Sequence, residues 1–66
     1  MKLIVNGQPQ EHSDGVTLAG VVAKLTAATS GVAVAVNDVV VPRGAWSTTS
    51  LADDDSVEVL TAVQGG

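Results

Sequence analysis

The sequence ends with Gly65 and Gly66, and the terminal α-carboxylate is the group best suited to do chemistry. Glycine lacks a Cβ atom, so a Gly-Gly end can enter a channel too narrow for any other residue. Residues 57–63 have the β-branched density of a strand, and this strand leads through Gln64 to the end. A carboxylate becomes reactive only when its oxygen is made a leaving group, which requires an activating enzyme with a nucleotide. We therefore interpret the end as a substrate for another enzyme, with Gly66 as the reacting residue.

Other sets of reactive side chains do not form a recognisable site. His12, Ser13 and Asp14 are consecutive, so they cannot converge on one reacting atom as a catalytic triad does, and we expect a solvated loop. Asp53–Asp55 lacks the alternate spacing, the glycine and the downstream glutamate of a calcium loop, so a charged turn is favoured. A single histidine without cysteine cannot build a zinc site, and no glycine-rich run matches a phosphate loop. We expect no enzyme activity, metal or cofactor of the chain's own.

Composition restricts the class of protein further. Residues 1–66 are expected to form a single domain, with 63–66 as a flexible C-terminal tail. Seven acidic and three basic side chains give a net charge of -4, which opposes nucleic-acid binding and favours basic protein surfaces. Without cysteine, a signal peptide or an apolar stretch of about 18 residues, the chain is expected to be cytoplasmic and not to bind membranes.

The first half of the chain reads as a hairpin followed by a helix. Asn6-Gly7 supplies the two positive-φ positions of a type I′ turn between a strand at residues 3–5 and a polar strand at 8–12. Pro9 assigns this second strand to a sheet edge, because proline donates no backbone hydrogen bond. Thr17 can cap a helix with apolar residues at one face, namely Leu18, Val21, Val22 and Leu25, which ends near Thr26, Thr29 and Gly31.

The second half reads as three strands and an irregular crossover. Residues 32–36 alternate valine and alanine, which predicts a strand with its valine face under the helix, and Asn37-Asp38 turns the chain into a short strand at 39–41. Residues 42–50 lack periodicity and form a surface crossover with one short helical turn, while Leu51 anchors it to the core. The order predicts an α+β fold with a mixed sheet of about four to five strands and one main helix across one face. If the first and last strands are parallel at its centre, the fold is a ubiquitin-like β-grasp.

Trp46 and Arg43 belong to the crossover. Trp46, the only aromatic residue, is expected to cap the small core in preference to contacting a partner. Arg43 pairs either with one of the carboxylates or with a partner protein. Neither side chain has an evident catalytic duty.

Several segments taken together resemble the ThiS family, the sulfur carrier proteins of thiamine biosynthesis. The likeness extends over nearly the whole chain and rests on Asn6, the helix start at 16–18, residues 34–37, Val41-Pro42-Arg43 with Trp46, residues 57–60 and Gly65-Gly66. Two positions depart from the expected pattern. Asp54 occupies a turn position where the family often has glycine, so we expect local strain or a changed turn, and Gly20 stands where a better helix former is expected.

The resemblance implies a β-grasp fold and a two-stage reaction at Gly66. A ThiF-like enzyme would adenylate the carboxylate with ATP and magnesium, a sulfur-donor relay protein would convert it to a thiocarboxylate, and a ThiG-like thiazole synthase would receive the sulfur. Binding to these partners is expected through one sheet face and a tail comprising Val63, Gln64, Gly65 and Gly66. The free protein is expected to be a monomer. Sulfur carried on the main chain would also account for the lack of cysteine.

Three alternatives share parts of this pattern. A molybdopterin-synthase-type sulfur carrier would use the same tail in another pathway. A ubiquitin-like modifier would form isopeptide bonds with target lysines. A plain binding module would dock by its acidic surface and would tolerate removal of Gly65 and Gly66.

Overall fold

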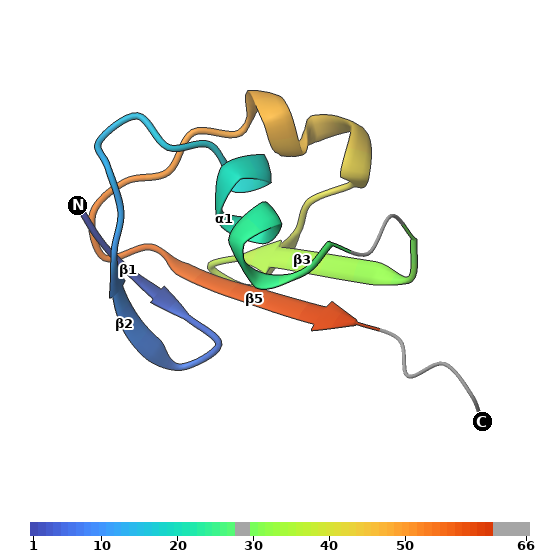
Figure 1. The fold of residues 1–66 in the computed structure, drawn as a ribbon, viewed down its shortest axis with the longest axis horizontal. Coiled ribbons are helices and arrows are strands. Elements are labelled where there is room, and N and C mark those ends of the chain that lie inside the picture. Colours follow the sequence, from blue (N-terminus) through green and yellow to red (C-terminus); the bar gives the residue numbers. More distant parts are fainter. Residues whose placement is uncertain (28–29, 62–66) are drawn as a thin grey trace.

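The computed structural model describes residues 1–27 and 30–61, which form five β-strands, one α-helix and one 3₁₀ helix (Figure 1). The strands are β1 (Lys2–Val5), β2 (Gln8–Glu11), β3 (Val32–Val36), β4 (Val39–Val40) and β5 (Ser56–Thr61). The helices are α1 (Leu18–Leu25) and the 3₁₀ helix η1 (Arg43–Thr48). The predicted order of hairpin, helix, two strands, crossover and final strand is confirmed. The short helical turn expected in the crossover is η1, and β4 ends one residue before the predicted limit.

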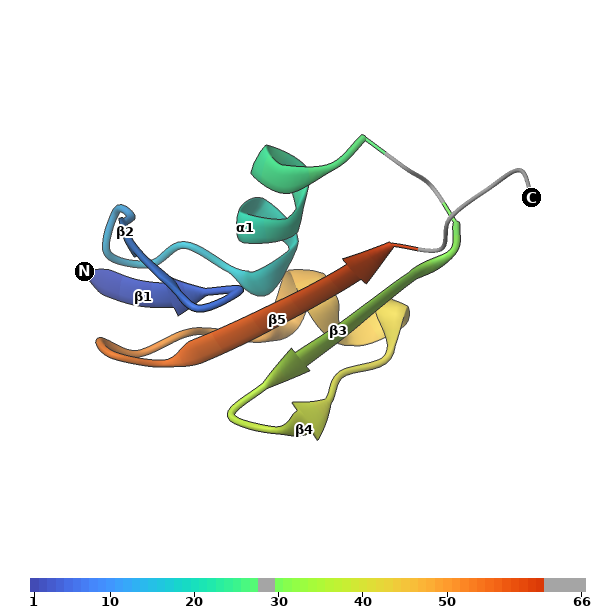
Figure 2. The ribbon, with the colours of Figure 1, turned by 90° about the horizontal axis from the view of Figure 1, so that it is seen from below.

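The strands form one mixed sheet in the order β2-β1-β5-β3-β4. β5 lies at the centre, where it pairs parallel with β1 and antiparallel with β3. Figure 2 shows β1 and β3 on opposite sides of β5. This arrangement confirms the α+β class and the ubiquitin-like β-grasp. Pro9 lies in the edge strand β2, as its missing N–H predicts.

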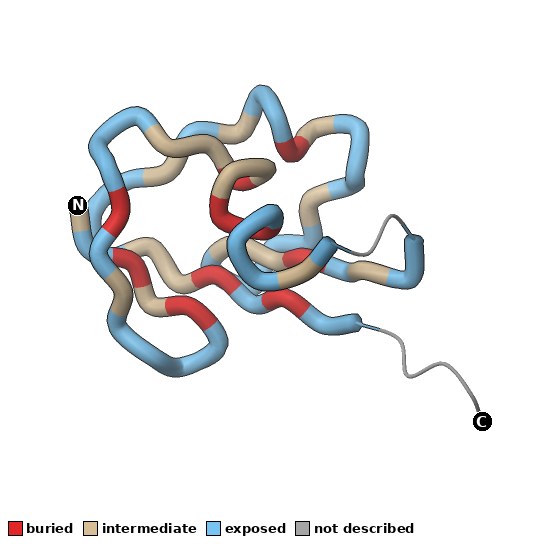
Figure 3. Tube along the Cα trace, in the orientation of Figure 1, coloured by how far each residue is buried: buried red, intermediate tan, exposed pale blue. Residues whose placement is uncertain are grey.

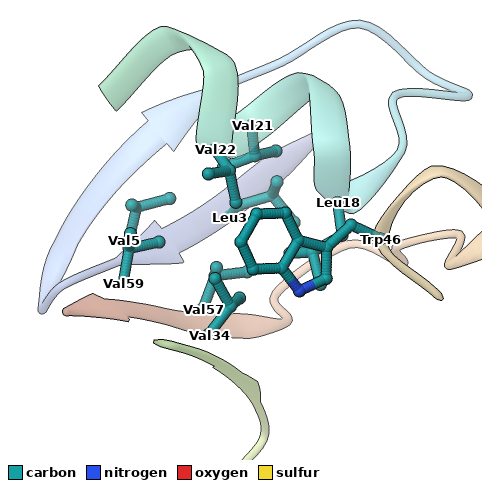
Figure 4. Packing of buried hydrophobic residues seen from close by; sticks show 9 residues of the cluster. All are labelled: Leu3, Val5, Leu18, Val21, Val22, Val34, Trp46, Val57 and Val59. Carbon is teal, nitrogen blue, oxygen red and sulfur yellow. The ribbon is translucent and has the colours of Figure 1, made fainter. Parts of the chain in front are cut away.

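The core is a single layer between α1 and one face of the sheet (Figure 3). Its nine buried members point toward one another in Figure 4; they are Leu3, Val5, Leu18, Val21, Val22, Val34, Trp46, Val57 and Val59. Thr17 caps α1 as predicted, because its Oγ1 accepts a hydrogen bond from the Gly20 amide at 3.3 Å. A Cβ atom on Gly20 would lie only 3.1 Å from Cγ2 of Val16, so a larger residue there would require the Val16 side chain to shift.

Two expectations for buried and exposed residues were wrong. Leu25, assigned to the apolar stripe of the helix, is 40% exposed because α1 ends there and Thr26 is extended, with φ -152°. His12, assigned to a solvated loop, is only 7% exposed. Gln10 pairs with Leu3 on the helix-facing side of the sheet, and the period of two directs His12 to the same side.

Two asparagine side chains hold β5 from both of its edges. Asn6, in the β1–β2 turn with φ 50°, accepts from the Val59 amide at 2.8 Å and donates to the Val59 carbonyl at 3.3 Å. Asn37, in the β3–β4 turn with φ 49°, accepts from the Ser56 amide at 3.0 Å and donates to Asp55 at 3.0 Å. Each asparagine therefore tolerates the left-handed turn conformation and extends the pairing of its strand by a side chain.

The acidic turn before β5 is structural. Asp53 Oδ1 accepts from the Lys2 amide at 2.6 Å, and Asp55 Oδ2 accepts from the Ala52 amide at 2.8 Å. Asp54 has φ 70°, which confirms that a non-glycine residue adopts positive φ at this position. Its carboxylate lies 3.1 Å from Nζ of Lys2, and the hydrogen bond and charge of Asp54 raise the pKa of Lys2. The predicted charged turn is thus confirmed.

Replacing Leu18 by alanine should destabilise the domain strongly. Leu18 is fully buried, so its truncation should leave a cavity and lower the free energy of unfolding by about 2–5 kcal/mol. Leu25→Ala is the matched control, because it makes the same chemical change on the same helix at an exposed position, and it should cost less than about 1 kcal/mol. Urea unfolding followed by circular dichroism measures both values. Equal losses would contradict the assignment of the core.

Replacing Asn6 by glycine should loosen β5 near its C-terminal end. Glycine keeps the positive φ but removes both bonds to Val59, so hydrogen exchange of the Val59 amide should accelerate. The expected loss of unfolding free energy is about 1–3 kcal/mol. Asn37→Gly is the comparison variant, and it should accelerate exchange at Ser56 while leaving Val59 protected. Unchanged exchange at Val59 in Asn6→Gly would refute the role of this side chain.

Candidate functional site

β5 leads directly to the predicted reactive tail. The strand runs along the centre of the sheet and ends at Thr61 (Figure 1). Val63, Gln64, Gly65 and Gly66, which were predicted to form the flexible tail, lie outside the described residues. The structure therefore defines the platform from which the tail starts, and the sites on the tail itself stay predictions.

The sheet face opposite α1 is open and carries an apolar groove. In β5, Val57 and Val59 point into the core, so Glu58 and Leu60 point to the open face. Leu60 is 66% exposed and Val40 is 73% exposed, both large values for aliphatic side chains. The groove has a volume of about 210 Å³, and its lining is Ala33, Val34, Ala35, Asp38, Val40, Glu58 and Leu60. We call this surface the open face.

Small and large side chains alternate across the open face. The β-sheet register sets Ala33 opposite Leu60 and Ala35 opposite both Glu58 and Val40. The alanines leave a depression between Leu60 and Val40, with the carboxylates of Asp38 and Glu58 in its lining. An apolar depression with acidic groups suits an apolar anchor on a basic partner surface. From the sequence, one sheet face was expected to bind partners, but its residues were not identified. Leu60 could have indicated them, because it is an apolar residue at an outward position of β5 where a polar one is expected.

The side chains of His12 and Asp14, from the consecutive set considered as a catalytic triad, contact different groups. His12 Nε2 lies 3.0 Å from Oε1 of Gln10, whereas Asp14 Oδ1 lies 3.4 Å from the N-terminal amine. These two members of the consecutive set are therefore engaged with different groups. Within residues 1–27 and 30–61, no three histidine or acidic side chains are grouped closely enough to hold a metal ion. In the same ranges, no helix has the length and apolar character needed to cross a membrane.

Trp46 closes the core from the side of η1, as predicted. Its side chain lies beside Val22 and Leu18 in Figure 4, and it is 7% exposed. The indole Nε1 donates to the carbonyl of Val41 at 2.9 Å, which satisfies its polar atom. The guanidinium of Arg43 lies over the indole at 5.2 Å from the ring centroid. Of the two partners expected for Arg43, a carboxylate is not found within 4.0 Å in the described part of the chain.

Solved structures with the same fold include one from Geobacter metallireducens. A crystal structure of its thiamine biosynthesis protein (ThiS) has a TM-score of 0.80 and 32% sequence identity, and the match covers 100% of both chains. A solution NMR structure of a thiamine biosynthesis protein from the same organism has a TM-score of 0.82 at 32% identity, covering 100% of this chain and 88% of that chain. The architecture described above is therefore shared over its full length.

Sequence relatives extend the comparison. A thiazole synthase of Magnetococcus marinus is 39% identical over 66 residues, which is 100% of this chain and 20% of that protein, so the chain spans about a fifth of this relative. An uncharacterized protein, ycf40, of Pyropia yezoensis is 36% identical over 62 residues, or 94% of this chain and 87% of that protein. The model of the ThiS family matches residues 3–66, which includes the terminal glycine pair. The chain belongs to the ThiS family.

Proposed function

We propose that this chain is a sulfur carrier for the thiazole branch of thiamine biosynthesis and that the sulfur is carried on the carboxyl carbon of Gly66. The observation that carries the proposal is the match to the ThiS family over residues 3–66, because it joins the β-grasp platform to Gly65 and Gly66. The shared fold with a ThiS thiamine biosynthesis protein supports it. In this role the chain is a protein substrate and sulfur donor, and partner enzymes perform the chemistry.

Activation requires a partner enzyme of the ThiF type with ATP and magnesium. A carboxylate oxygen of Gly66 attacks the α-phosphorus of ATP, pyrophosphate leaves, and the resulting acyl-adenylate has AMP as its leaving group. A relay protein then supplies sulfur at the oxidation level of sulfide; this sulfur attacks the carbonyl carbon, the bond to AMP breaks, AMP leaves, and the thiocarboxylate forms. Gly65 supplies the slender backbone that lets Gly66 reach the nucleotide, while Val63 and Gln64 contact the walls of the entry channel.

The acceptor of the sulfur is a thiazole synthase of the ThiG type. Support comes from the thiazole synthase of Magnetococcus marinus, in which a region similar to this chain makes up 20% of the protein. A carrier-like region within a thiazole synthase fits a delivery role, because covalent linkage raises the effective concentration of the carried group. We infer that this chain delivers its sulfur to the same kind of enzyme.

Docking to the partners uses the open face. Leu60 and Val40 offer exposed apolar surface, and Asp38 and Glu58 repel acidic partners. Since β5 contributes Leu60 and leads toward the tail, a partner held on this face would be positioned to receive Gly66. The activating enzyme and the thiazole synthase would then use the face in turn, because one surface cannot hold both partners at once.

Thiocarboxylate formation tests the proposed chemistry directly. After incubation with a ThiF-like enzyme, ATP, magnesium and a sulfur source, intact mass spectrometry should show replacement of one oxygen by one sulfur at Gly66. Gly65→Val should abolish this change by blocking entry, while leaving the free energy of unfolding within about 0.5 kcal/mol of the parent value. Gly44→Val is the matched control, because apart from its chain neighbours and the local backbone of η1 no atom lies within 4 Å of a Cβ at that position, and it should still be modified.

The contrary outcomes separate the alternatives. An unmodified parent chain in the complete mixture would overturn the carrier role. Adducts to lysines that disappear when Gly66 is deleted would favour a ubiquitin-like modifier. Sulfur transfer to a molybdopterin synthase, without transfer to thiazole synthase, would favour the molybdopterin-synthase-type sulfur carrier.

A charge placed on the open face should weaken binding of the activating enzyme. Leu60→Glu should raise the dissociation constant at least about tenfold, because it removes an apolar contact and would bury a carboxylate beside Glu58. Leu25→Glu is the matched control on the helix side of the molecule, and it should change the constant less than about twofold. Isothermal titration calorimetry measures both. Equal weakening by the two variants would contradict docking through the open face.

A further inference from the structure

A second groove lies on the opposite side of the molecule, between α1 and η1. The two helices pack together on the same side of the sheet (Figure 1). The groove has a volume of about 410 Å³, and its lining is Ala19, Val22, Ala23, Thr26, Ala27, Arg43 and Trp46. We call it the helix groove. None of its lining residues belongs to the open face, so occupation of one surface leaves the other free.

The chemistry of the helix groove is the reverse of that of the open face. Its lining consists of three alanines, Val22 and Trp46 together with Thr26 and Arg43, and it contains none of the seven acidic side chains of the chain. The ion pairs within the described residues engage the N-terminal amine and Lys2, at the other end of the sheet, with Glu11, Asp14 and Asp54. Of the two grooves, the helix groove therefore carries a cation and the open face carries acidic groups.

The guanidinium of Arg43 is positioned to bind an anion. Its guanidinium lies over the indole of Trp46 at 5.2 Å, and the indole is itself fixed by its buried ring and by the bond to the Val41 carbonyl. A cation–π contact does not require the guanidinium N–H groups as hydrogen-bond donors, so these groups can bind a partner. Arg43 is exposed and has no carboxylate within 4.0 Å in the described part of the chain. Such a planar fork matches a carboxylate in two parallel hydrogen bonds.

We infer that the helix groove is a docking site for an acidic, apolar segment of a partner protein, with a carboxylate on Arg43 and an aliphatic side chain on the alanines. Local charge complementarity selects this occupant: Arg43 is the charged residue in the lining, and its guanidinium attracts a carboxylate at this groove although the chain as a whole carries a net charge of -4. A small ligand is disfavoured because Ala23, Ala27 and Arg43 are exposed, so the groove cannot enclose it. The site lets one protein hold the carrier while another occupies the open face.

Binding of short peptides tests this inference. The probes are a blocked peptide of leucine and glutamate and its counterpart with lysine in place of every glutamate. The glutamate peptide should shift the NMR signals of Ala19, Ala23 and Arg43 and the fluorescence of Trp46, the single tryptophan of the chain. The lysine peptide should bind this groove at least about tenfold more weakly, a difference expected for one charged contact.

Variants make the test specific. Arg43→Glu should weaken binding of the glutamate peptide at least tenfold and improve that of the lysine peptide, whereas Lys24→Glu makes the same change of charge outside the groove lining and should have less than about a twofold effect. Ala23→Glu, at an exposed position, should also weaken binding of the glutamate peptide by adding a competing carboxylate. Thermal unfolding confirms that each variant is folded. Shifts centred on Ala33 and Leu60, equal effects of the two charge reversals, or no binding at millimolar peptide would overturn the inference.

Discussion

The parallel pairing of β1 with β5 is the constraint on which the remaining structure depends. The Ile4 amide donates to the Asp55 carbonyl at 2.9 Å and the Asn6 amide donates to the Val57 carbonyl at 2.8 Å, so the two ends of the sequence meet at the centre of the sheet. Parallel neighbours require a long crossover, and here the whole of residues 6–55 supplies it. β5 is central: it pairs with β1 and β3, and these strands in turn pair with the edge strands β2 and β4. A substitution that disrupts the packing of α1 or η1 on the sheet would therefore also disturb β5 and the strands beside it.

A core of one layer explains why side chains at the turns have structural roles. A domain of 66 residues buries only about 60% of the surface that its unfolded chain exposes, so burial alone gives a small margin of stability. Asn6 and Asn37, the residues that follow β1 and β3, add side-chain hydrogen bonds to β5. Trp46 adds a large apolar surface from η1, which a core of valines and leucines could not provide. Asn6, Asn37 and Trp46, on which the resemblance to the family rests, thus each stabilise the fold.

The sequence predicted the fold well because its local signals agreed with one another. Asn6-Gly7, Pro9, Thr17 and the alternation of residues 32–36 each specify backbone geometry locally, and each was confirmed. The errors at Leu25 and His12 arose where tertiary placement overrides local pattern: one lies on the last turn of a helix, and the other continues a strand face beyond the strand. The side-chain bonds of Asn6 to Val59 depend on contacts 53 positions apart in sequence, which no local pattern encodes. Identifying the residues of the open face likewise required the strand register. Ala33 and Ala35 can be recognised as part of a groove only once Leu60 and Val40 are known to lie opposite them.

The arrangement of the two grooves also bears on how a carrier protein without catalytic side chains selects its partner proteins. If the reacting atom belongs to the main chain of Gly66, the choice of partner must come from surfaces away from it, because a glycine pair offers almost nothing to recognise. The two grooves differ in sign: Asp38 and Glu58 line the open face, and Arg43 lines the helix groove. Surfaces of opposite charge on opposite sides of one small sheet can discriminate two classes of partner at once, with each repelling the class that the other attracts. A protein bound at the helix groove would in this way retain the small domain while the activating enzyme and the thiazole synthase exchange on the open face.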